Sequence, residues 1–208
     1  MKVRIARTVT HPTRHNRLLR WSRDAFLAAG VLALGYCGFV LLDTKIYQSY
    51  QTTRFEEQLN AVRPAIAAAG ALPVAAIPRG ALGRIEIPRI GLTAMIMEGT
   101  DGRTLRRAVG HVPGTPLPGQ QGNAAIAGHR DTFFRPLRNI HHDDEINLTT
   151  LNGTYRYVVD SAQVVAPEDT QVLDDSNEAV LTLVTCYPFY FVGPAPKRFI
   201  VRAHKIPG

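Results

Sequence analysis

The sequence lacks the signatures of several common enzyme classes. Its 208 residues include only two cysteines, Cys37 and Cys186, which cannot form a disulfide framework. No CxxC pair or Cys/His cluster is present, so the sequence predicts no zinc site. The GxSxG, HExxH, P-loop and GxGxxG motifs are also absent, which excludes serine esterases, zincins, P-loop enzymes and dinucleotide-binding enzymes in their usual form.

Acidic residues are missing from the N-terminal end of the chain. Residues 1–23 contain seven Lys or Arg residues and no Asp or Glu, so they carry the whole net charge of +7. Because the chain has 24 basic and 17 acidic residues in total, the remainder is neutral. A neutral remainder offers no basic face, and the sequence therefore predicts no nucleic-acid partner.

A long apolar run follows the basic tail. Residues 25–42 contain no charge, and eighteen helical residues span about 27 Å, close to the hydrocarbon core of a bilayer. We therefore predict a basic cytoplasmic tail at 1–23 and a single transmembrane anchor at 24–43, with the rest of the chain on the outer side of the cell membrane. A cleaved signal peptide is the alternative, but no small-residue cleavage site follows the run.

Helical periodicity continues beyond the anchor. Apolar residues recur at near-helical spacing from Tyr47 to Ile66, which predicts a helix that ends around Pro64. The following stretch, 65–80, is rich in Ala, Pro and Gly and is typical of a spacer. These features predict a helical and Ala/Pro-rich linker over residues 44–81, which leaves 82–208 for a folded domain.

Short β-branched runs separated by Gly, Pro, Asn and Asp dominate the rest of the chain. This pattern is typical of an all-β domain, and about 127 residues of mostly antiparallel strand predict a small closed barrel. A short helix is expected at 102–108, with Asp101 as its N-cap. The predicted strands are 83–87, 90–96, 123–128, 145–150, 155–165, 180–186 and 197–204.

The one cysteine outside the predicted anchor is a candidate nucleophile. Cys186 ends an apolar run before Pro188, which puts its thiol at a strand end. A catalytic thiol needs a nearby base or cation, because a free thiol is only about 3% ionised at neutral pH. His129 also ends an apolar run, and Arg198 opens the last strand, where a guanidinium can donate to an oxyanion. Arg202 is a reserve candidate, and a buried, inert Cys186 is the alternative interpretation.

These residues carry a resemblance to a known family. TLVTC at 182–186, AGH at 127–129 and KRFIVRA at 197–203, in this order behind an N-terminal anchor, resemble the sortases, the membrane-anchored cysteine transpeptidases of bacterial surfaces. TLVTCYPF and GHRDTFF are more similar to class D members than to the class A pattern. The resemblance covers residues 82–206 and implies a closed eight-stranded β-barrel with short helices.

The resemblance also implies a reaction. Sortases cleave a sorting motif such as LPxTG, or LPxTA in class D, on secreted proteins and join the new carboxyl end to an amine on the cell envelope or on a second protein. By resemblance, Cys186 is the nucleophile, Arg198 stabilises the oxyanion, and His129 exchanges protons with the departing and incoming amines. The partners would be sorting-motif proteins, an amine acceptor and membrane lipid. The substrate-binding residues that the resemblance implies are Thr185, Val172 and Leu173.

The sequence also contains candidates for a metal site and allows other functions. No obligatory cofactor is expected, but some sortases bind calcium, for which residues 141–145 and Asp174–Asp175 are the candidates here; a solvated turn is the favoured interpretation of 141–145. His111, before a Pro/Gly-rich loop, is a further candidate for the cleft. The alternative functions are a cysteine hydrolase on the same fold and a membrane-tethered binding module with an inert cysteine.

Overall fold

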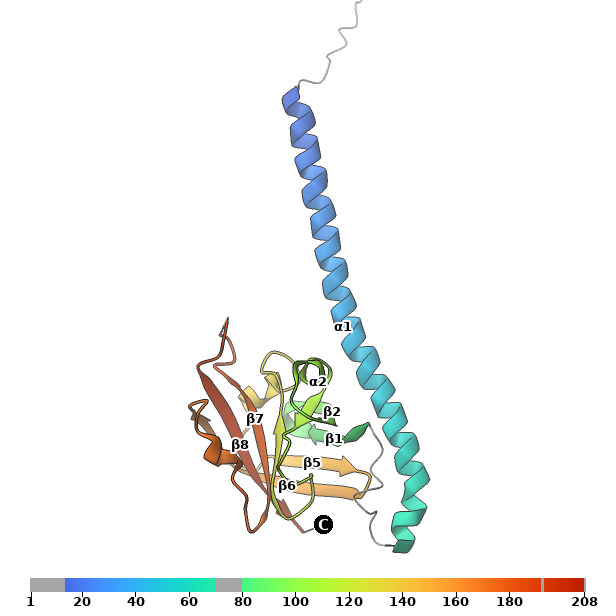
Figure 1. Ribbon diagram of the computed structural model, residues 1–208, viewed down its shortest axis with the longest axis vertical. Coiled ribbons are helices and arrows are strands. Elements are labelled where there is room, and N and C mark those ends of the chain that lie inside the picture. The colour runs from blue at the N-terminus through green and yellow to red at the C-terminus, as the bar shows by residue number, and fades with distance from the viewer. Residues whose placement is uncertain (1–13, 70–79, 192, 208) are drawn as a thin grey trace, which may run out of the picture. The chain divides into compact units, whose positions relative to one another are not determined.

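A computed structural model describes residues 14–69, 80–191 and 193–207 (Figure 1). It divides into two compact units, with the boundary between Asp43 and Thr44. Most of the predicted basic tail, residues 1–13, lies outside the described residues, and so does the part of the predicted spacer at 70–79.

One long helix, α1 (Arg14–Ala69), begins the described chain. The segment 19–62 of this helix is long enough and apolar enough to cross a membrane. Large apolar side chains such as Phe26, Val31 and Phe39 are exposed there, and a helix that is apolar on all sides is typical of a membrane span. The chain therefore has the N-terminal apolar helix that the sequence predicts.

The helix extends farther than its sequence pattern indicates. The expected end was Pro64, whereas α1 continues to Ala69. Proline removes one N–H donor from a helix interior, but the residues after it read AIAAA, and alanine is the strongest helix former. Residues 65–69 are therefore helical, and the spacer prediction was wrong for them.

Eight strands close into a barrel in the order β1-β2-β3-β4-β7-β8-β6-β5. The β2–β3 and β4–β7 pairs are parallel and the other pairs are antiparallel. The closed all-β barrel is thereby confirmed. The strands are β1 (Ala81–Ile87), β2 (Leu92–Glu98), β3 (Val109–His111), β4 (Gly122–Ala127), β5 (Glu145–Thr150), β6 (Gly153–Val165), β7 (Ala179–Tyr187) and β8 (Lys197–Ile206).

Short helices connect some of the strands. The helix α2 (Gly102–Arg107) confirms the predicted segment, and the Asp101 carboxylate accepts from two backbone N–H groups of its first turn. The 3-10 turns are η2 (Pro88–Ile90), η3 (Arg135–Asn139) and η4 (Thr170–Leu173).

Most predicted strands differ from the structure by one or two residues at one or both ends, and two further differences have a clear physical reason. β3 has three residues, too few to show a period-2 pattern, and the sequence did not predict it. Residues 88–90 belong to η2 and not to a strand, because Pro88 opens this turn and Gly91, at φ 64°, ends it. The strand predicted at 90–96 therefore lies two residues later, at β2.

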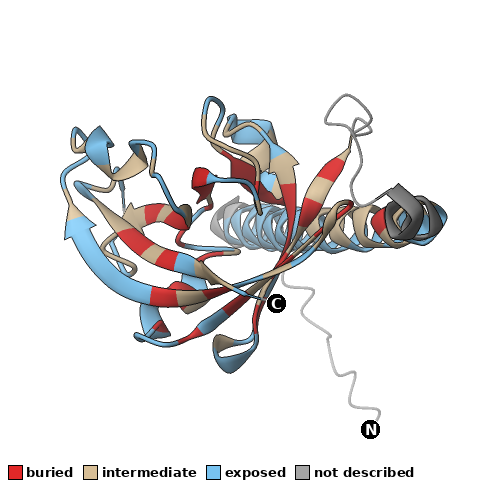
Figure 2. Cartoon of the chain, turned by 90° about the horizontal axis from the view of Figure 1, so that it is seen from below, coloured by how far each residue is buried: buried red, intermediate tan, exposed pale blue. Residues whose placement is uncertain are grey.

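Inward-facing residues of the strands fill the barrel, and Figure 2 colours the buried positions of the chain red. Since successive side chains of a strand point to opposite faces, the residues between the inward ones lie on the outer face. We call the outer face of three neighbouring strands the β4-β7-β8 face. The inward residues of these strands include Ala124, Ile126, Leu181, Leu183, Val201 and Ala203.

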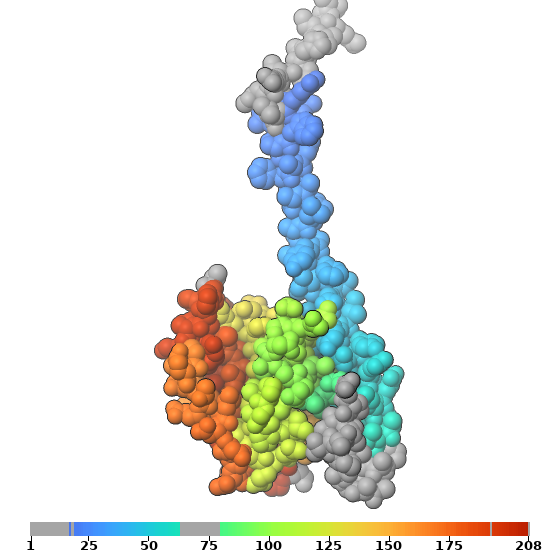
Figure 3. Space-filling view, viewed as in Figure 1, coloured from blue at the N-terminus to red at the C-terminus, as the bar shows by residue number. Residues whose placement is uncertain are grey.

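Part of α1 packs against the barrel within the second unit (Figure 3). The Gln48 side chain accepts from the backbone N–H of Met95 at 3.1 Å, and Arg84 Nη1 donates to Glu56 at 2.7 Å. In the strand order, β7 lies opposite β1, so this docked segment is on the other side of the barrel from Cys186. The predicted linker thus contains a docked helix. The buried contact joins Phe55, which is 1% exposed, to Ala81, Met95 and Leu151.

Candidate functional site

Strand register brings the three predicted catalytic residues into one row. Cys186 at the end of β7 is paired with Arg198 at the start of β8. On the other side of β7, Ala127 of β4 is paired in parallel with Val184. His129 follows Ala127 by two residues, as Cys186 follows Val184, so the parallel register puts His129 beside Cys186. The row therefore reads His129, two residues beyond the end of β4, then Cys186 in β7 and Arg198 in β8.

All three side chains belong to the β4-β7-β8 face. Leu183 and Val201 are core residues, and Cys186 and Arg198 are each three positions away from them, which is the opposite face of the strand. Neighbouring strands lie about 4.8 Å apart, which sets the spacing of the row at its backbone. His129 is exposed, while Cys186 and Arg198 are half-buried. Cys186 therefore lies outside the barrel core, and its role as nucleophile stays a prediction.

The three side chains do not contact one another through polar interactions. Among the residues that the structure describes, no hydrogen bond or ion pair links His129, Cys186 and Arg198. Arg198 Nη1 instead donates to the carbonyls of Ala195 at 3.3 Å and Lys197 at 3.0 Å. Both bonds use one nitrogen, so they leave three further N–H donors of the guanidinium unengaged. Arg198 is therefore oriented by its own loop and retains donors for an oxyanion.

Two backbone hydrogen bonds and the packing of one aromatic ring fix the backbone around His129. Gly128 N–H donates to the Val184 carbonyl at 3.1 Å, which continues the parallel ladder, and the His129 carbonyl accepts from Phe134 N–H at 3.1 Å. A Cβ on Gly128 would come within 2.7 Å of the Phe134 ring, which is fully buried. Only glycine allows this ring to pack beneath the backbone, so Gly128 helps to fix His129 next to β7.

Thr185 lies on the inner face of β7 and does not belong to the row of His129, Cys186 and Arg198. Its side chain is 2% exposed on the inner face, and its hydroxyl donates to the Gly128 carbonyl at 2.7 Å. It thereby ties the residue before Cys186 to the residue before His129. A direct contact between Thr185 and a substrate stays a prediction.

Val172 and Leu173 belong to η4, in the loop between β6 and β7, and both are half-buried. The Asn123 amide at the start of β4 donates to the Val172 carbonyl at 3.1 Å and to the Asp174 carbonyl at 3.0 Å. Asn123 is on the β4-β7-β8 face, so these bonds hold the loop onto it. The contact of Val172 and Leu173 with a substrate remains a prediction.

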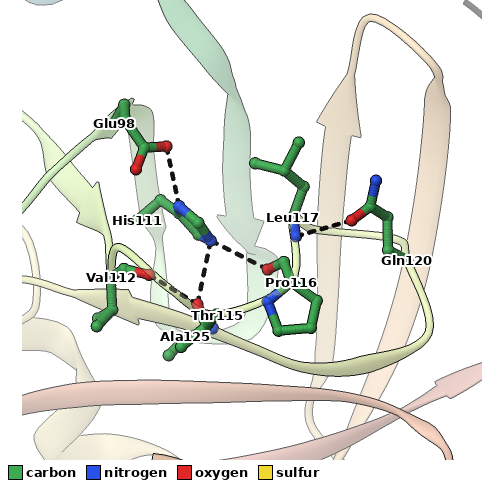
Figure 4. A network of polar contacts seen from close by, with 8 residues as sticks. All are labelled: Glu98, His111, Val112, Thr115, Pro116, Leu117, Gln120 and Ala125. Atoms are coloured by element: carbon green, nitrogen blue, oxygen red, sulfur yellow. Dashed lines mark hydrogen bonds and ion pairs between the residues drawn. The ribbon is translucent and has the colours of Figure 1, made fainter. Parts of the chain in front are cut away.

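His111 does not join this row. It is paired with Ile126, three residues before His129, which is about 10 Å along the strand. Its Nδ1 lies 2.9 Å from the Glu98 carboxylate, and its Nε2 lies 3.0 Å from the Pro116 carbonyl and 3.1 Å from the Thr115 hydroxyl (Figure 4). Both ring nitrogens are engaged, so His111 holds the loop after β3 and the suggestion that it approaches the cleft was wrong.

The carboxylates considered for calcium do not form a metal site. Among the described residues, no group of three or more His, Cys, Asp or Glu side chains lies close enough to hold a metal ion. Asp144 is 5% exposed, so the solvated turn predicted for 141–145 is wrong at this residue. Its carboxylate accepts from both Arg89 Nε and, at 2.6 Å, Arg89 Nη2, and from the backbone N–H of His141 at 2.7 Å.

Asp144 gives a testable pH dependence. The hydrogen bond from Arg89 lowers the pKa of the Asp144 carboxyl below its usual value. Its stabilising contribution is therefore present above the unfolded pKa of about 4 and is lost as the pH falls through the folded pKa. We expect Asp144→Asn to lower the free energy of unfolding by about 2 kcal/mol at pH 7 and by much less at pH 2.

The measurement is thermal unfolding of the full chain in detergent micelles at both pH values. Asp143→Asn is the matched control, because Asp143 is 79% exposed and asparagine tolerates its φ of 67°. An equal loss for Asp144→Asn at pH 7 and pH 2 would contradict this account.

Arg130 is a residue of this region that the sequence did not single out. It follows His129 directly, and it is 6% exposed, although arginine is rarely so buried. A charged residue in a loop is usually solvated. The one feature of the sequence that could have pointed to Arg130 is its position directly after the AGH motif. Its contacts are with the loop that follows Cys186.

Comparison with known proteins agrees with this geometry. The family model described as the sortase domain matches residues 85–206, which is more than half of the chain. Sortase D of Bacillus subtilis (strain 168) is 34% identical over 190 residues, which cover 86% of this chain and 95% of that protein. Sortase A of Listeria monocytogenes is 28% identical over 109 residues, 50% of this chain and 49% of that protein.

Solved structures show the same barrel. The Clostridium perfringens Sortase D5 transpeptidase has a TM-score of 0.66 and 29% identity, and the match covers 77% of this chain and 99% of that one. Sortase A from Corynebacterium diphtheriae has a TM-score of 0.59 and 28% identity, and covers 79% and 93%. The domain match, the closed barrel and these relatives together establish that the chain belongs to the sortase family of cysteine transpeptidases and is class D-like.

Proposed function

We propose that this protein is a membrane-anchored transpeptidase that cleaves a sorting motif of the LPxTG or LPxTA kind and transfers the acyl part to an amine. The observation that supports the proposal is the pairing of Cys186 with Arg198 between β7 and β8, beside β4, whose end is followed two residues later by His129. A half-buried thiol between an imidazole and a guanidinium has a nucleophile, a proton carrier and an oxyanion donor within one site.

The first half-reaction forms a thioester. His129 takes the thiol proton as the Cys186 sulfur attacks the carbonyl carbon of the motif threonine, and the negative charge moves to the carbonyl oxygen. Arg198 donates to this oxyanion with the N–H groups that its loop carbonyls leave unengaged. The C–N bond then breaks, and His129 gives a proton to the departing amine.

The second half-reaction releases the product. An incoming amine attacks the thioester carbonyl, His129 takes its proton, and the Cys186 sulfur leaves as the new amide bond forms. The thioester conserves the reactivity of the cleaved peptide bond, so no external energy source is needed. Water in place of the amine would give hydrolysis by the same residues.

The surface next to the row supports an apolar peptide as substrate. Half-buried Ala127 and Val184, which are small or aliphatic, form the adjacent row of the β4-β7-β8 face, next to Ile200, which is only 2% exposed. We infer that this row is the floor under the leucine and proline of the motif, with Val172 and Leu173 of η4 at its edge and Thr185 supporting the backbone beneath.

The apolar helix and the basic tail support a single membrane anchor. The seven positive charges of residues 1–23 would keep this end in the cytoplasm, so the barrel would face the cell envelope. Its partners there would be secreted proteins that carry a sorting motif and an amine on the envelope or on a second protein. In this proposal, neither half-reaction requires a cofactor, because side chains of this chain carry out every step.

Product analysis tests the proposed function. The full chain in detergent micelles is incubated with LPxTG and LPxTA peptides, with and without glycinamide, and the products are identified by mass spectrometry. We expect a glycinamide adduct of the peptide when the amine is present. Hydrolysed peptide alone at high glycinamide would favour the cysteine hydrolase, and an uncleaved peptide would favour the binding module.

Replacement of Arg198 should reduce the chemical step. Loss of one oxyanion donor costs about 10²–10³-fold in kcat, and this is the loss expected for Arg198→Ala. Arg198→Lys should recover little, because an ammonium lacks the planar fork of donors. Steady-state kinetics measure both variants beside Arg202→Ala, which changes the reserve candidate opposite Thr182. A larger loss for Arg202→Ala would show that the roles had been assigned to the wrong arginine.

A further inference from the structure

Arg130 places a buried positive charge directly beside the proposed site. Its side chain is 7% exposed, and the carboxylate near it, Asp131, is 71% exposed at 3.5 Å from Nε. A buried cation is unfavourable unless it is hydrogen-bonded. The hydrogen-bond partners of Arg130 therefore indicate which part of the structure it stabilises. Those partners are three backbone carbonyls.

All three carbonyls belong to one loop. Arg130 Nη1 donates to the Pro188 carbonyl at 2.9 Å, and Nη2 donates to the carbonyls of Phe191 at 2.7 Å and Gly193 at 3.0 Å. This loop, residues 188–196, leaves the strand of Cys186 and enters the strand of Arg198. The guanidinium therefore joins the end of β4 to the connection between β7 and β8.

The same loop orients Arg198. The Arg198 guanidinium donates to the Ala195 carbonyl, two residues after Gly193. The contacts thus run from Arg130 to the loop, and from the loop to Arg198. We propose that Arg130 is a positioning residue, which acts through loop 188–196 to hold Arg198 in place opposite Cys186. This inference rests on the proposed function for the role of Arg198.

Only arginine suits this position. The three bonds come from two nitrogens of one planar group and reach carbonyls spread over six residues of chain. Lysine keeps the charge but has its donors on a single nitrogen, so it cannot reproduce the fork. Arg130→Lys and Arg130→Met are therefore both informative, and Arg130→Lys keeps a variant available if Arg130→Met does not fold.

The test is a double-mutant cycle in the full chain. We expect Arg130→Met and Arg130→Lys each to lower kcat by about 10–100-fold, with KM changed less than about 3-fold. If Arg130 acts through Arg198, then adding Arg130→Met to Arg198→Met should lower kcat by less than about 3-fold more. Additive losses would mean that Arg130 is merely structural, and would overturn the proposal.

Hydrogen exchange provides a readout that needs no substrate. The Phe191 amide, which donates to the Pro188 carbonyl at 3.4 Å, should exchange at least about 10-fold faster in the Arg130 variants, while the amides of β1 and β2 stay unchanged. Arg138→Met is the matched control, because exposed Arg138 contacts the side chain of Tyr190 in the same loop, with its Nη1 2.7 Å from the hydroxyl and its guanidinium over the ring, and no hydrogen bond joins it to a described backbone carbonyl of that loop. Unchanged exchange in the loop would overturn the proposal, whereas a wild-type chain without transfer activity would refute the proposed function instead.

Discussion

Cys186→Ala is expected to abolish acyl transfer, with a loss of about 10⁴-fold or more, while the barrel stays folded. The loss is large because the thioester cannot form without the sulfur, and removal of a covalent nucleophile is among the most severe changes that an enzyme undergoes. The effect on folding is small because Cys186 is half-buried on the outer face, where truncation removes one atom from a partly exposed side chain. Initial rates with a sorting-motif peptide and glycinamide measure the loss.

The chain supplies its own control for this prediction. Cys37 is an exposed residue of α1 in the unit that ends at Asp43. The Cys37→Ala variant should transfer acyl groups at the wild-type rate. Near-ultraviolet circular dichroism of both variants checks that the barrel is intact. Transfer by Cys186→Ala within 10-fold of wild type would mean that the thiol is not the nucleophile.

The second large effect is expected for His129→Ala. A positioned acid–base group contributes about 10²–10⁴-fold, and His129 is used in both half-reactions, so we expect acylation and aminolysis each to slow by an amount in that range. The side chain is exposed, and the backbone contacts that hold it do not involve the imidazole. Stability should therefore change by less than about 0.5 kcal/mol.

Separate measurements of the two steps make this prediction specific. Rapid mixing followed by acid quench gives the rate of acylation of Cys186, and the amine dependence of product formation gives the second rate. His142→Ala is the control, because His142 is 68% exposed and contacts Asp143. A variant that loses only one step, or neither, would require a different proton carrier.

The sequence predicted the barrel well because its strands carry strong local signals. The segment 145–150 was predicted at its observed bounds, and its buried residues alternate throughout with exposed or half-buried ones. β3 was missed because three residues show no period, and its pairing with β2 and β4 depends on residues far away in the chain. The end of α1 was missed because propensity summed over several alanines exceeds the effect of a single proline.

The site was predictable in its residue types but not in its arrangement. Strand-end positions marked Cys186 and His129, but only the register between β7 and β8 puts Arg198, not Arg202, opposite the thiol. That register follows from how the buried residues of the two strands match each other and from the geometry of the loop between them, and the pattern of one strand by itself does not give it. The hold of Arg130 on the loop is a long-range contact of the same kind.

Intact mass spectrometry of the full chain after incubation with a sorting-motif peptide, without added amine, tests the central claim most directly. We expect a mass increase equal to the acyl fragment up to the motif threonine, located on Cys186 by peptide mapping and removed by glycinamide. An unmodified Cys186 after every LPxTG and LPxTA peptide, under conditions in which iodoacetamide alkylates the same thiol, would contradict the account.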